Sequence, residues 1–288
     1  MNKFKTLFEN VFKSKTSILI SVLITSALIP LAVNLLFKLI LFKAVMENRF
    51  HFVLIGLFIY CGWLAILFFL YRKDTIKLKD LTITKQKFIT GLSAGIYVFI
   101  FVNLILFASC FIHSRSLIIS EYFSSIGLTL KTFGLFIFNI IPGAFIEELV
   151  FRAYLIPQIF IRINNKLSNS VVSLVVTIFI TQVLFAVAHV PRDLFRNDYN
   201  FLIISNNLIH LFESGIMLSL IFLRTKNIFF VTIYHAFTNF SLDIVSSPYF
   251  VSYSTIVTVI IALLWNKIIE PKETKEGQGL HKRYNIFM

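Results

Sequence analysis

The chain of 288 residues is 57% hydrophobic and 14% charged, whereas about 25% of the residues in a typical soluble domain are charged. Its mean hydropathy of +0.83 excludes a soluble globular domain and predicts an integral membrane protein. The net charge of +13 comes mostly from short loops between apolar runs. This pattern indicates contact with a lipid bilayer and its anionic headgroups, and no nucleic-acid partner is expected.

Eight apolar segments are candidate membrane spans, since a helix needs about 20 apolar residues to cross the hydrocarbon core. They cover approximately residues 17–37, 50–71, 88–112, 130–160, 169–190, 201–223, 228–246 and 250–267. Apolar runs of this length, without alternating polarity, exclude a transmembrane β-barrel. The predicted fold class is therefore all-α, a polytopic transmembrane helical bundle of about eight spans.

Proline and glycine predict irregular backbone at two places in this bundle. The fourth segment is too long for one simple span and contains Pro142, Gly143 and Pro157, so a break or bend is expected there. Pro191 follows the fifth segment and is a further expected break point. The last 20 residues or so are polar and predict a tail beyond the final span.

Lysine and arginine are distributed unevenly between the two sets of connecting segments. With the N-terminus inside, nineteen of the 27 lie in inner segments, six in outer segments and two within the fourth span. Cytoplasmic loops of membrane proteins carry the excess of these residues. We therefore expect a multi-pass protein of the plasma membrane with both termini in the cytoplasm.

The stretch "FIEELVFRAYL", residues 145–155, places three charges inside an apolar segment. A charged group at membrane depth costs about 2.5–3.5 kcal/mol on insertion scales, so we expect it to face the protein interior and to have a function. On a helix, Glu148 and Arg152 share one face and can neutralise each other. Glu147 points about 100° away and lacks a partner on its own helix, which suits a general base. The alternative is a salt-bridged helix end at the membrane surface.

Two later stretches add polar groups to apolar segments. "FAVAH" ends at His189, and "HAFTN" places His235 and Asn239 one helical turn apart. Each pattern alone also fits a structural role, a helix cap in the first case and an interhelical polar contact in the second. "HLFES" places His210 and Glu213 on one face of the sixth segment, where we expect a structural or cavity-lining role.

Taken together, one carboxylate, two histidines and an amide on three apolar segments are the groups that activate a water and stabilise an oxyanion. They indicate hydrolysis of an amide bond. Two histidines and one glutamate also form a ligand set for zinc with an open position. Glu147, His189 and His235 are the candidate ligands if a divalent metal is used, most naturally zinc, and a metal-free mechanism stays open. The chain has no HExxH motif, which excludes a zincin.

The stretches "EELVFR", "FAVAH" and "HAFTN", in this order, resemble the three motifs EExxxR, FxxxH and HxxxN of the CPBP intramembrane proteases. This family includes the type II CAAX prenyl proteases and proteins linked to bacteriocin processing and self-immunity. Its domain is also known as the Abi or lysostaphin resistance protein A-like domain. The resemblance covers about residues 130–246 and leaves the first three spans without a motif. Members of the family are often labelled metalloproteases, although a mechanism without a metal is also discussed for the family.

The resemblance implies a role for each matching residue. Glu147 resembles the glutamate that activates the attacking water, with His189 as its partner. His235 and Asn239 resemble the pair that stabilises the oxyanion. The supporting acid and arginine of the family correspond to Glu148 and Arg152.

Three parts of the chain are expected from these observations. Residues 1–125 form N-terminal transmembrane helices, residues 126–250 form the intramembrane protease core, and residues 251–288 form the last transmembrane helix and a cytoplasmic tail. In this scheme His189 lies near the outer end of its span, Glu147 at mid-depth and His235 nearer the inner end. These residues meet only if helices tilt or break, or if the loop 191–202 folds inward.

The leading hypothesis is an intramembrane endopeptidase that cleaves a membrane-embedded or membrane-anchored protein or peptide, in bacteriocin-related processing or in self-immunity. One alternative is a non-catalytic immunity or scaffold protein of the membrane, in which the same polar residues bind a peptide. Another is a small transporter that uses Glu147 and Glu213 as proton sites.

Overall fold

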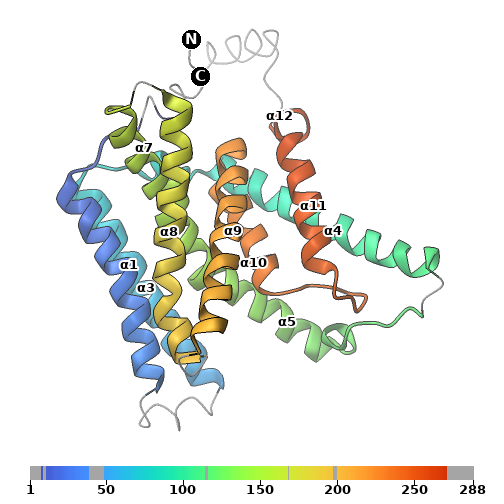
Figure 1. The fold of residues 1–288 in the computed structure, drawn as a ribbon. Helices are drawn as coiled ribbons and strands as arrows, with labels where there is room; N and C mark the ends of the chain where they lie inside the picture. The colour runs from blue at the N-terminus through green and yellow to red at the C-terminus, as the bar shows by residue number, and fades with distance from the viewer. Residues whose placement is uncertain are drawn as a thin grey trace, which may run out of the picture.

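The computed structural model describes residue 8 and residues 11–38, 49–113, 116–167, 169–196 and 200–270, most of which are helical. Figure 1 shows helices joined by irregular segments. Within these ranges, the only strand-like pairing is an isolated antiparallel bridge between Ile119 and Val245. The predicted all-α polytopic bundle is therefore confirmed, whereas the predicted polar tail from residue 271 onward lies outside the described residues.

The longer helices are, in chain order, α1 (Thr16–Lys38), α3 (Arg49–Lys73), α4 (Lys85–Ile112), α5 (Ile126–Phe138), α7 (Ile156–Asn164), α8 (Ser170–Arg196), α9 (Phe201–Thr225), α10 (Ile228–Asn239) and α11 (Phe250–Leu263). The shorter turns are η2 (Leu78–Leu81), η3 (Glu121–Phe123), η4 (Asn139–Ala144), α6 (Phe145–Glu148), η5 (Leu149–Leu155) and α12 (Trp265–Ile268). In Figure 1, α1, α8 and α9 run roughly parallel to one another, and α4 and α5 extend obliquely away from them.

Six segments of the described chain are long and apolar enough to cross a membrane, and they correspond to the first six predicted spans. The predicted seventh and eighth spans are shorter helices, because α10 ends at Asn239 and α11 covers only Phe250–Leu263. The helix α10 ends where it does because Phe240 adopts an extended backbone, with φ −149° and ψ 110°. The span predicted over residues 228–246 was therefore too long.

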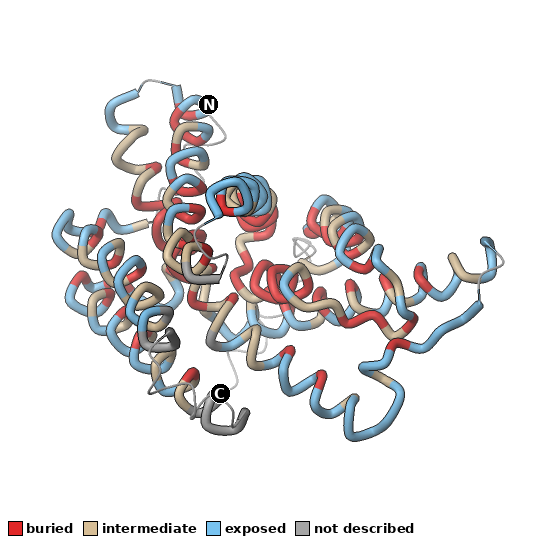
Figure 2. The backbone as a smooth tube through the Cα atoms, turned by 60° about the horizontal axis from the view of Figure 1, so that its bottom comes forward, coloured by how far each residue is buried: buried red, intermediate tan, exposed pale blue. Residues whose placement is uncertain are grey.

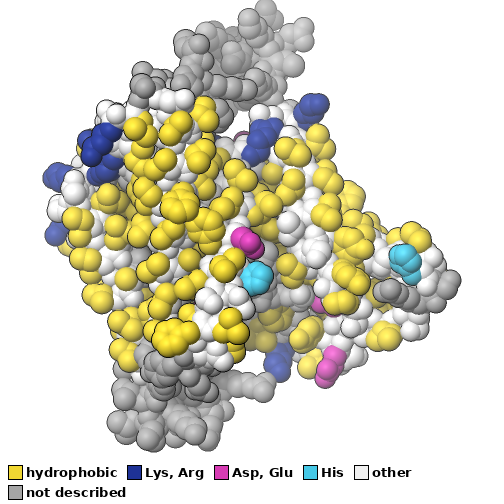
Figure 3. Space-filling model, viewed as in Figure 1, with side chains coloured by type: hydrophobic (Ala, Val, Ile, Leu, Met, Phe, Trp, Pro, Cys, Tyr) yellow, Lys and Arg dark blue, Asp and Glu magenta, His cyan; other side chains and the backbone are white. Residues whose placement is uncertain are grey.

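The outer surfaces of the helices are apolar. Side chains such as Phe58, Ile126 and Phe201 are more than three-quarters exposed. Figure 2 shows the buried residues on the inward-facing sides of the helices, and Figure 3 shows hydrophobic side chains over most of the visible face. Several Lys and Arg side chains gather near the upper end of that face. A surface of this kind is solvated by lipid hydrocarbon, as in an integral membrane protein.

The fourth predicted span continues from Ile126 to Asn164 without interruption, although its backbone is irregular where a break was expected. The segment η4, which contains Pro142 and Gly143, and the segment η5 are both π-helical. They lie on either side of α6, the single turn that carries Glu147. Such π-helical turns occur frequently at functional sites. Pro157 lies in the first turn of α7, where proline is tolerated.

The expectation of a break at Pro191 is wrong. The helix α8 contains this proline and continues to Arg196. A proline inside a transmembrane helix is tolerated when neighbouring groups satisfy the freed backbone carbonyl. His189 therefore lies within α8, with its last two turns still to follow.

Close packing between α4 and α10 depends on two glycines one turn apart. A Cβ atom added to Gly91 would lie 2.8 Å from the backbone nitrogen of Phe230, and one added to Gly95 would lie 2.7 Å from Ile233 Cγ2. Small residues allow transmembrane helices to approach closely in this way. The two glycines thus determine how near α10, which carries His235, lies to α4.

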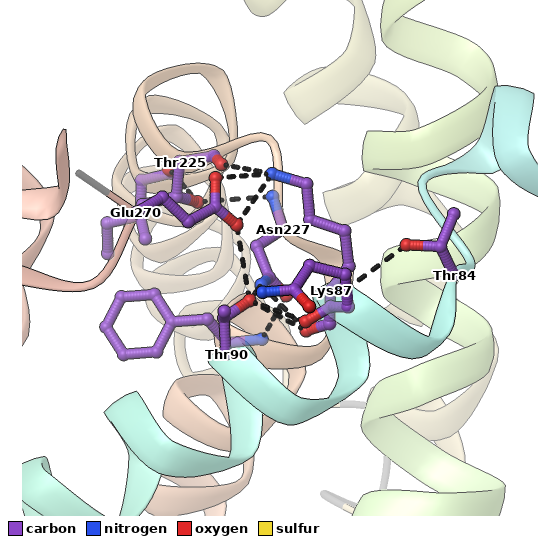
Figure 4. A network of polar contacts seen from close by, with 9 residues as sticks. Thr84, Lys87, Thr90, Thr225, Asn227 and Glu270 are labelled. Atoms are coloured by element: carbon purple, nitrogen blue, oxygen red, sulfur yellow. Dashed lines mark hydrogen bonds and ion pairs between the residues drawn. The ribbon is translucent and has the colours of Figure 1, made fainter. Parts of the chain in front are cut away.

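A polar network anchors the same helix pair at the start of α4 (Figure 4). Asn227 Nδ2 donates to Lys87 O at 2.8 Å and to Thr90 Oγ1 at 3.0 Å. Asn227 Oδ1 accepts from Phe230 N at 3.1 Å and so caps α10. Lys87 Nζ in turn pairs with Glu270 at 2.9 Å. The network ties α4, the α9–α10 turn and the end of the described chain together.

We predict that Gly91→Ala lowers the thermal unfolding midpoint of the protein in detergent, because the added methyl group would meet the backbone of α10. Overpacking of this kind costs about 1–3 kcal/mol. Gly62→Ala on α3 is the matched control, since nothing lies within 4 Å of its added Cβ. If both variants unfold at the parental temperature, close contact at Gly91 does not limit the packing of α4 on α10.

Candidate active site

The structure brings the predicted site residues together from three helical segments. Glu147 and Glu148 lie on α6, Arg152 follows on η5, His189 lies on α8, and His235 and Asn239 lie on α10. Glu147 Oε2 is 3.6 Å from His189 Nε2 and 3.8 Å from His235 Nε2. The three motifs that are separated in the sequence therefore form one cluster.

Glu148 and Arg152 form the fully buried part of this cluster. Arg152 Nη1 donates to Glu148 Oε1 at 3.1 Å, and neither side chain is exposed. This confirms that the two residues neutralise each other on one helical face. Arg152 also lies over the ring of Phe185, 4.3 Å from its centre, and its Nη2 lies within 3.4 Å of Gln182 Oε1 and Gly215 O. Arg152 thus connects η5 with α8 and α9.

Glu148 also orients His235. His235 Nδ1 lies 2.7 Å from Glu148 Oε1. This carboxylate oxygen also accepts from Arg152 Nη1, and it accepts a hydrogen bond from His235 Nδ1 as well. The opposite nitrogen, Nε2, is thereby directed toward Glu147. Glu148 and Arg152 therefore act as positioning residues behind the groups that face the cavity.

His189 is oriented by its own helix. Its Nδ1 lies 2.8 Å from the carbonyl oxygen of Phe185, which can only accept a hydrogen bond, so the proton of neutral His189 is on Nδ1. Its Nε2 then presents a lone pair toward Glu147. The ring also makes an edge contact with the Phe185 ring, with centroids 4.7 Å apart, which limits rotation of the imidazole.

Glu147 differs from Glu148 in its surroundings. It lacks a partner on its own helix, as predicted, but histidines of α8 and α10 lie on either side of its carboxylate. Its side chain is 27% exposed, whereas that of Glu148 is fully buried. One glutamate of the pair is therefore structural, and the other is accessible.

The accessible groups line a cavity of about 390 Å³. Glu147, His189 and Asn239 lie on its wall together with Arg192 of α8. The helices α1 and α3 contribute Ser26 and Trp63 among other residues. The cavity is large enough to hold several waters. Residues of the three sequence motifs form part of its wall, and residues of α1 and α3 form another part.

The predicted difference in depth does not keep the site residues apart, because Glu147 Oε2 lies within 4 Å of a nitrogen of His189 and of His235. The helix α8 extends beyond His189 to Arg196, so this histidine is not at a helix end. The helix α10 is only 12 residues long; His235 is buried within it, whereas Asn239, its last residue, is exposed and lines the cavity.

Of the two roles expected for His210 and Glu213, a structural one or the lining of a cavity, the second is wrong. His210 and Glu213 do adjoin, with 3.7 Å between His210 Nδ1 and Glu213 Oε2, but their side chains are 79% and 65% exposed. They lie on the outer face of α9 and do not line the cavity. The spacing of three residues predicted that they share a face, but it contained no information on where that face points.

Two polar residues of the site were not singled out from the sequence. Asn139 lines the cavity, and its Nδ2 donates to Ala236 O at 3.1 Å, one turn before Asn239. Gln182 accepts from Arg152 and donates to Ser219 Oγ at 2.9 Å. Each is a lone amide in an apolar segment, and this signal would have identified both.

The donor chemistry of the cavity suits a divalent metal such as zinc. His189 has its Nδ1 held by a backbone carbonyl and His235 has its Nδ1 held by a carboxylate, the usual arrangement behind metal-binding histidines. Glu147 Oε2 lies between the two Nε2 atoms. In the side-chain positions that the structure describes, however, no three His, Cys, Asp or Glu residues form a closed ligand set.

We predict that Arg152→Met destabilises the protein by about 3–5 kcal/mol, because it leaves the Glu148 carboxylate buried without a cation. The measurement is thermal or denaturant-induced unfolding in detergent. The double variant Glu148→Gln with Arg152→Met should recover part of the loss, since no buried charge then lacks a partner. Parental stability in Arg152→Met alone would show that the ion pair is not a determinant of the fold.

One protein family has a model that matches this chain. The family is described as type II CAAX prenyl endopeptidase Rce1-like, and the match covers residues 129–241. No curated protein and no solved structure matches the chain. The matched segment begins in α5 and ends just after α10, so it contains all six predicted site residues and leaves α1, α3 and α4 outside. The match over residues 129–241 supports the resemblance of this segment to the CPBP intramembrane proteases.

Proposed function

We propose that this protein hydrolyses a peptide bond of a membrane-embedded or membrane-anchored protein or peptide, with a water that Glu147 activates. The observation that carries the proposal is the position of Glu147 Oε2 between two imidazole nitrogens on the wall of a polar cavity. A carboxylate placed this way is a general base within reach of a water and of groups that stabilise an oxyanion.

The first step is the attack of water. The 3.6 Å between Glu147 Oε2 and His189 Nε2 is too long for a direct hydrogen bond, and a water can bridge the two atoms. The His189 lone pair orients this water by accepting one proton in a hydrogen bond. Glu147 removes the other proton as the water oxygen bonds to the carbonyl carbon of the substrate.

The second requirement is a donor for the oxyanion. The two histidines are the candidate donors. His235 is the better placed of the two, because it lies 2.7 Å from one carboxylate and 3.8 Å from the other. When protonated, it donates Nδ1–H to Glu148 and has Nε2–H available for the oxyanion. Asn239, one turn later on α10 and on the wall of the cavity, supplies an amide donor.

The tetrahedral species then collapses with cleavage of the carbon–nitrogen bond. The leaving amine takes the proton that Glu147 received from water, and the carboxylate is regenerated. The products are one new carboxyl group and one new amine. Each of these steps uses only groups of this chain.

A zinc ion, when bound, would be held by Glu147, His189 and His235. It would supply Lewis-acid polarisation of the carbonyl group. Activity assayed before and after chelation, together with the metal content of the purified protein, separates the two mechanisms. Loss of activity that Zn²⁺ restores identifies a metalloprotease, whereas retained activity in metal-free protein identifies catalysis by the side chains alone.

The proposed setting is the plasma membrane, with both termini in the cytoplasm and residues 126–250 as the protease core. The excess of Lys and Arg in the predicted inner segments supports this orientation. We also propose a role in bacteriocin-related processing or self-immunity, which rests on the resemblance of the three motifs alone. Protection from a bacteriocin that survives in Glu147→Ala and His189→Ala would favour peptide binding without catalysis.

We predict that Glu147→Gln lowers the rate of peptide cleavage by at least about 10²–10⁴-fold, the usual contribution of a general base. Glutamine keeps the shape of the side chain but cannot accept the proton. The assay uses purified protein in liposomes with a membrane peptide as substrate. Glu213→Gln is the matched control, because Glu213 is exposed on α9. Cleavage by Glu147→Gln at the parental rate would contradict the mechanism.

Asn239→Ala tests the oxyanion role separately. We expect a decrease in kcat of about 10²–10³-fold, as for the loss of one oxyanion donor, with little change in KM. The reason is that the amide contacts the oxygen mainly after it has become charged. An increase in KM with unchanged kcat would instead indicate that Asn239 binds the substrate before the reaction.

A further inference from the structure

A small apolar pocket lies between α1 and α8, beside the catalytic cavity. Its volume is about 150 Å³, and Leu23 and Ala27 of α1 line it together with Leu184 and Val187 of α8. The pocket opens onto the outer surface, where Val187 is 56% exposed, and its volume is about that of an apolar cavity that accepts benzene. The pocket is thus suited to one leucine or phenylalanine side chain.

The pocket and the catalytic cavity share part of their walls. Ser26, Phe151 and Ala188 line both of them. Ala188 immediately precedes His189, and Phe151 is one turn of helix from Glu147. A peptide whose scissile carbonyl group lies at Glu147 would therefore bring a neighbouring side chain to the entrance of the pocket.

Two polar groups of the N-terminal helices support a peptide as the occupant. Ser26 Oγ and Trp63 Nε1 are buried, and neither has a hydrogen-bond partner in the part of the chain that the structure describes. Thr25, next to Ser26, donates instead to the carbonyl groups of its own helix at 2.9 and 3.0 Å. Buried donors without acceptors are costly, and the main-chain carbonyl groups of a substrate would supply acceptors for both.

We propose that the pocket between α1 and α8 is a substrate subsite that receives an apolar side chain adjacent to the scissile bond, while Ser26 donates to the substrate main chain. This inference rests on the proposed function, because it assigns a specificity determinant to the same site. The helix α1 lies outside the segment that matches the family, residues 129–241. The subsite is therefore formed jointly by α8, inside the matched segment, and by α1, outside it.

The test uses the full chain in liposomes with a single-span reporter peptide whose cleavage site is mapped by mass spectrometry. The two residues that flank the scissile bond are changed, one at a time, to Ala, Leu or Phe. At one of these positions the parent protein should prefer Leu or Phe over Ala by about tenfold or more in kcat/KM. Ala27→Leu fills the pocket and should bring this ratio close to one.

Ala32→Leu is the matched control for the added volume. Ala32 is exposed on the same helix and lines neither cavity, so this variant should keep the parental ratio. An unchanged ratio in Ala27→Leu, with cleavage intact, overturns the subsite and leaves the proposed function in place. An equal loss for all three side chains shows a general packing defect and also overturns the subsite. A parent protein that cleaves none of the peptides overturns the proposed function and the subsite with it.

Cross-linking distinguishes a peptide side chain from a lipid chain as the occupant. In Glu147→Gln, a reporter peptide with photo-leucine at the preferred position should label Leu23 or Leu184, and Ala27→Leu should reduce the yield severalfold. A photoreactive phospholipid tests the alternative, in which a lipid chain occupies the pocket. If it labels the same residues equally with and without the peptide, the pocket is a lipid site and the proposal is overturned.

Discussion

The buried ion pair between Glu148 and Arg152 is the interaction on which the rest of the site depends. Neither charge is exposed, and an unpaired charge at this depth would be strongly destabilising. The pair is completed by His235, Gln182 and Gly215 from three other helices. Arg152 therefore connects η5 to α8 and α9, and Glu148 connects α6 to α10 and orients His235.

This arrangement separates the roles of two adjacent glutamates. Because Glu148 uses its carboxylate for Arg152 and His235, Glu147 is free to face the cavity. Successive residues of a helix point about 100° apart, so one can be buried while the next is accessible. Two neighbouring carboxylates on one turn of helix thus provide a buried anchor and an accessible group.

The backbone around the cavity is irregular or closely packed in several places. The π-helical segments η4 and η5 enclose the single turn that carries both glutamates. The helix α10 is short and closely packed on α4 through Gly91 and Gly95. Asn139, at the start of η4, binds Ala236 O just before Asn239. The segments η4 and α10 are thus held to each other by a polar contact near the cavity.

Much of the fold was predictable because membrane insertion leaves a strong signal in composition and in the length of apolar runs. The first six spans were predicted, and so was the ion pair between Glu148 and Arg152, which depends only on helical spacing. The helix end at Asn239 and the continuation of α8 through Pro191 were not predictable. Neither follows from helical periodicity or from the length of an apolar run, which are the signals that the sequence contains.

The sequence by itself determined that the chain is a helical membrane protein and which glutamate is paired with Arg152, because apolar length and helical periodicity are local properties. It also contained the six polar residues that form the cluster. Only the tertiary structure decided that His189, His235 and Glu147 meet within 4 Å, and that His210 and Glu213 lie on the outer surface. The direction in which a helical face points depends on the packing of distant segments, which residue spacing along one helix does not encode.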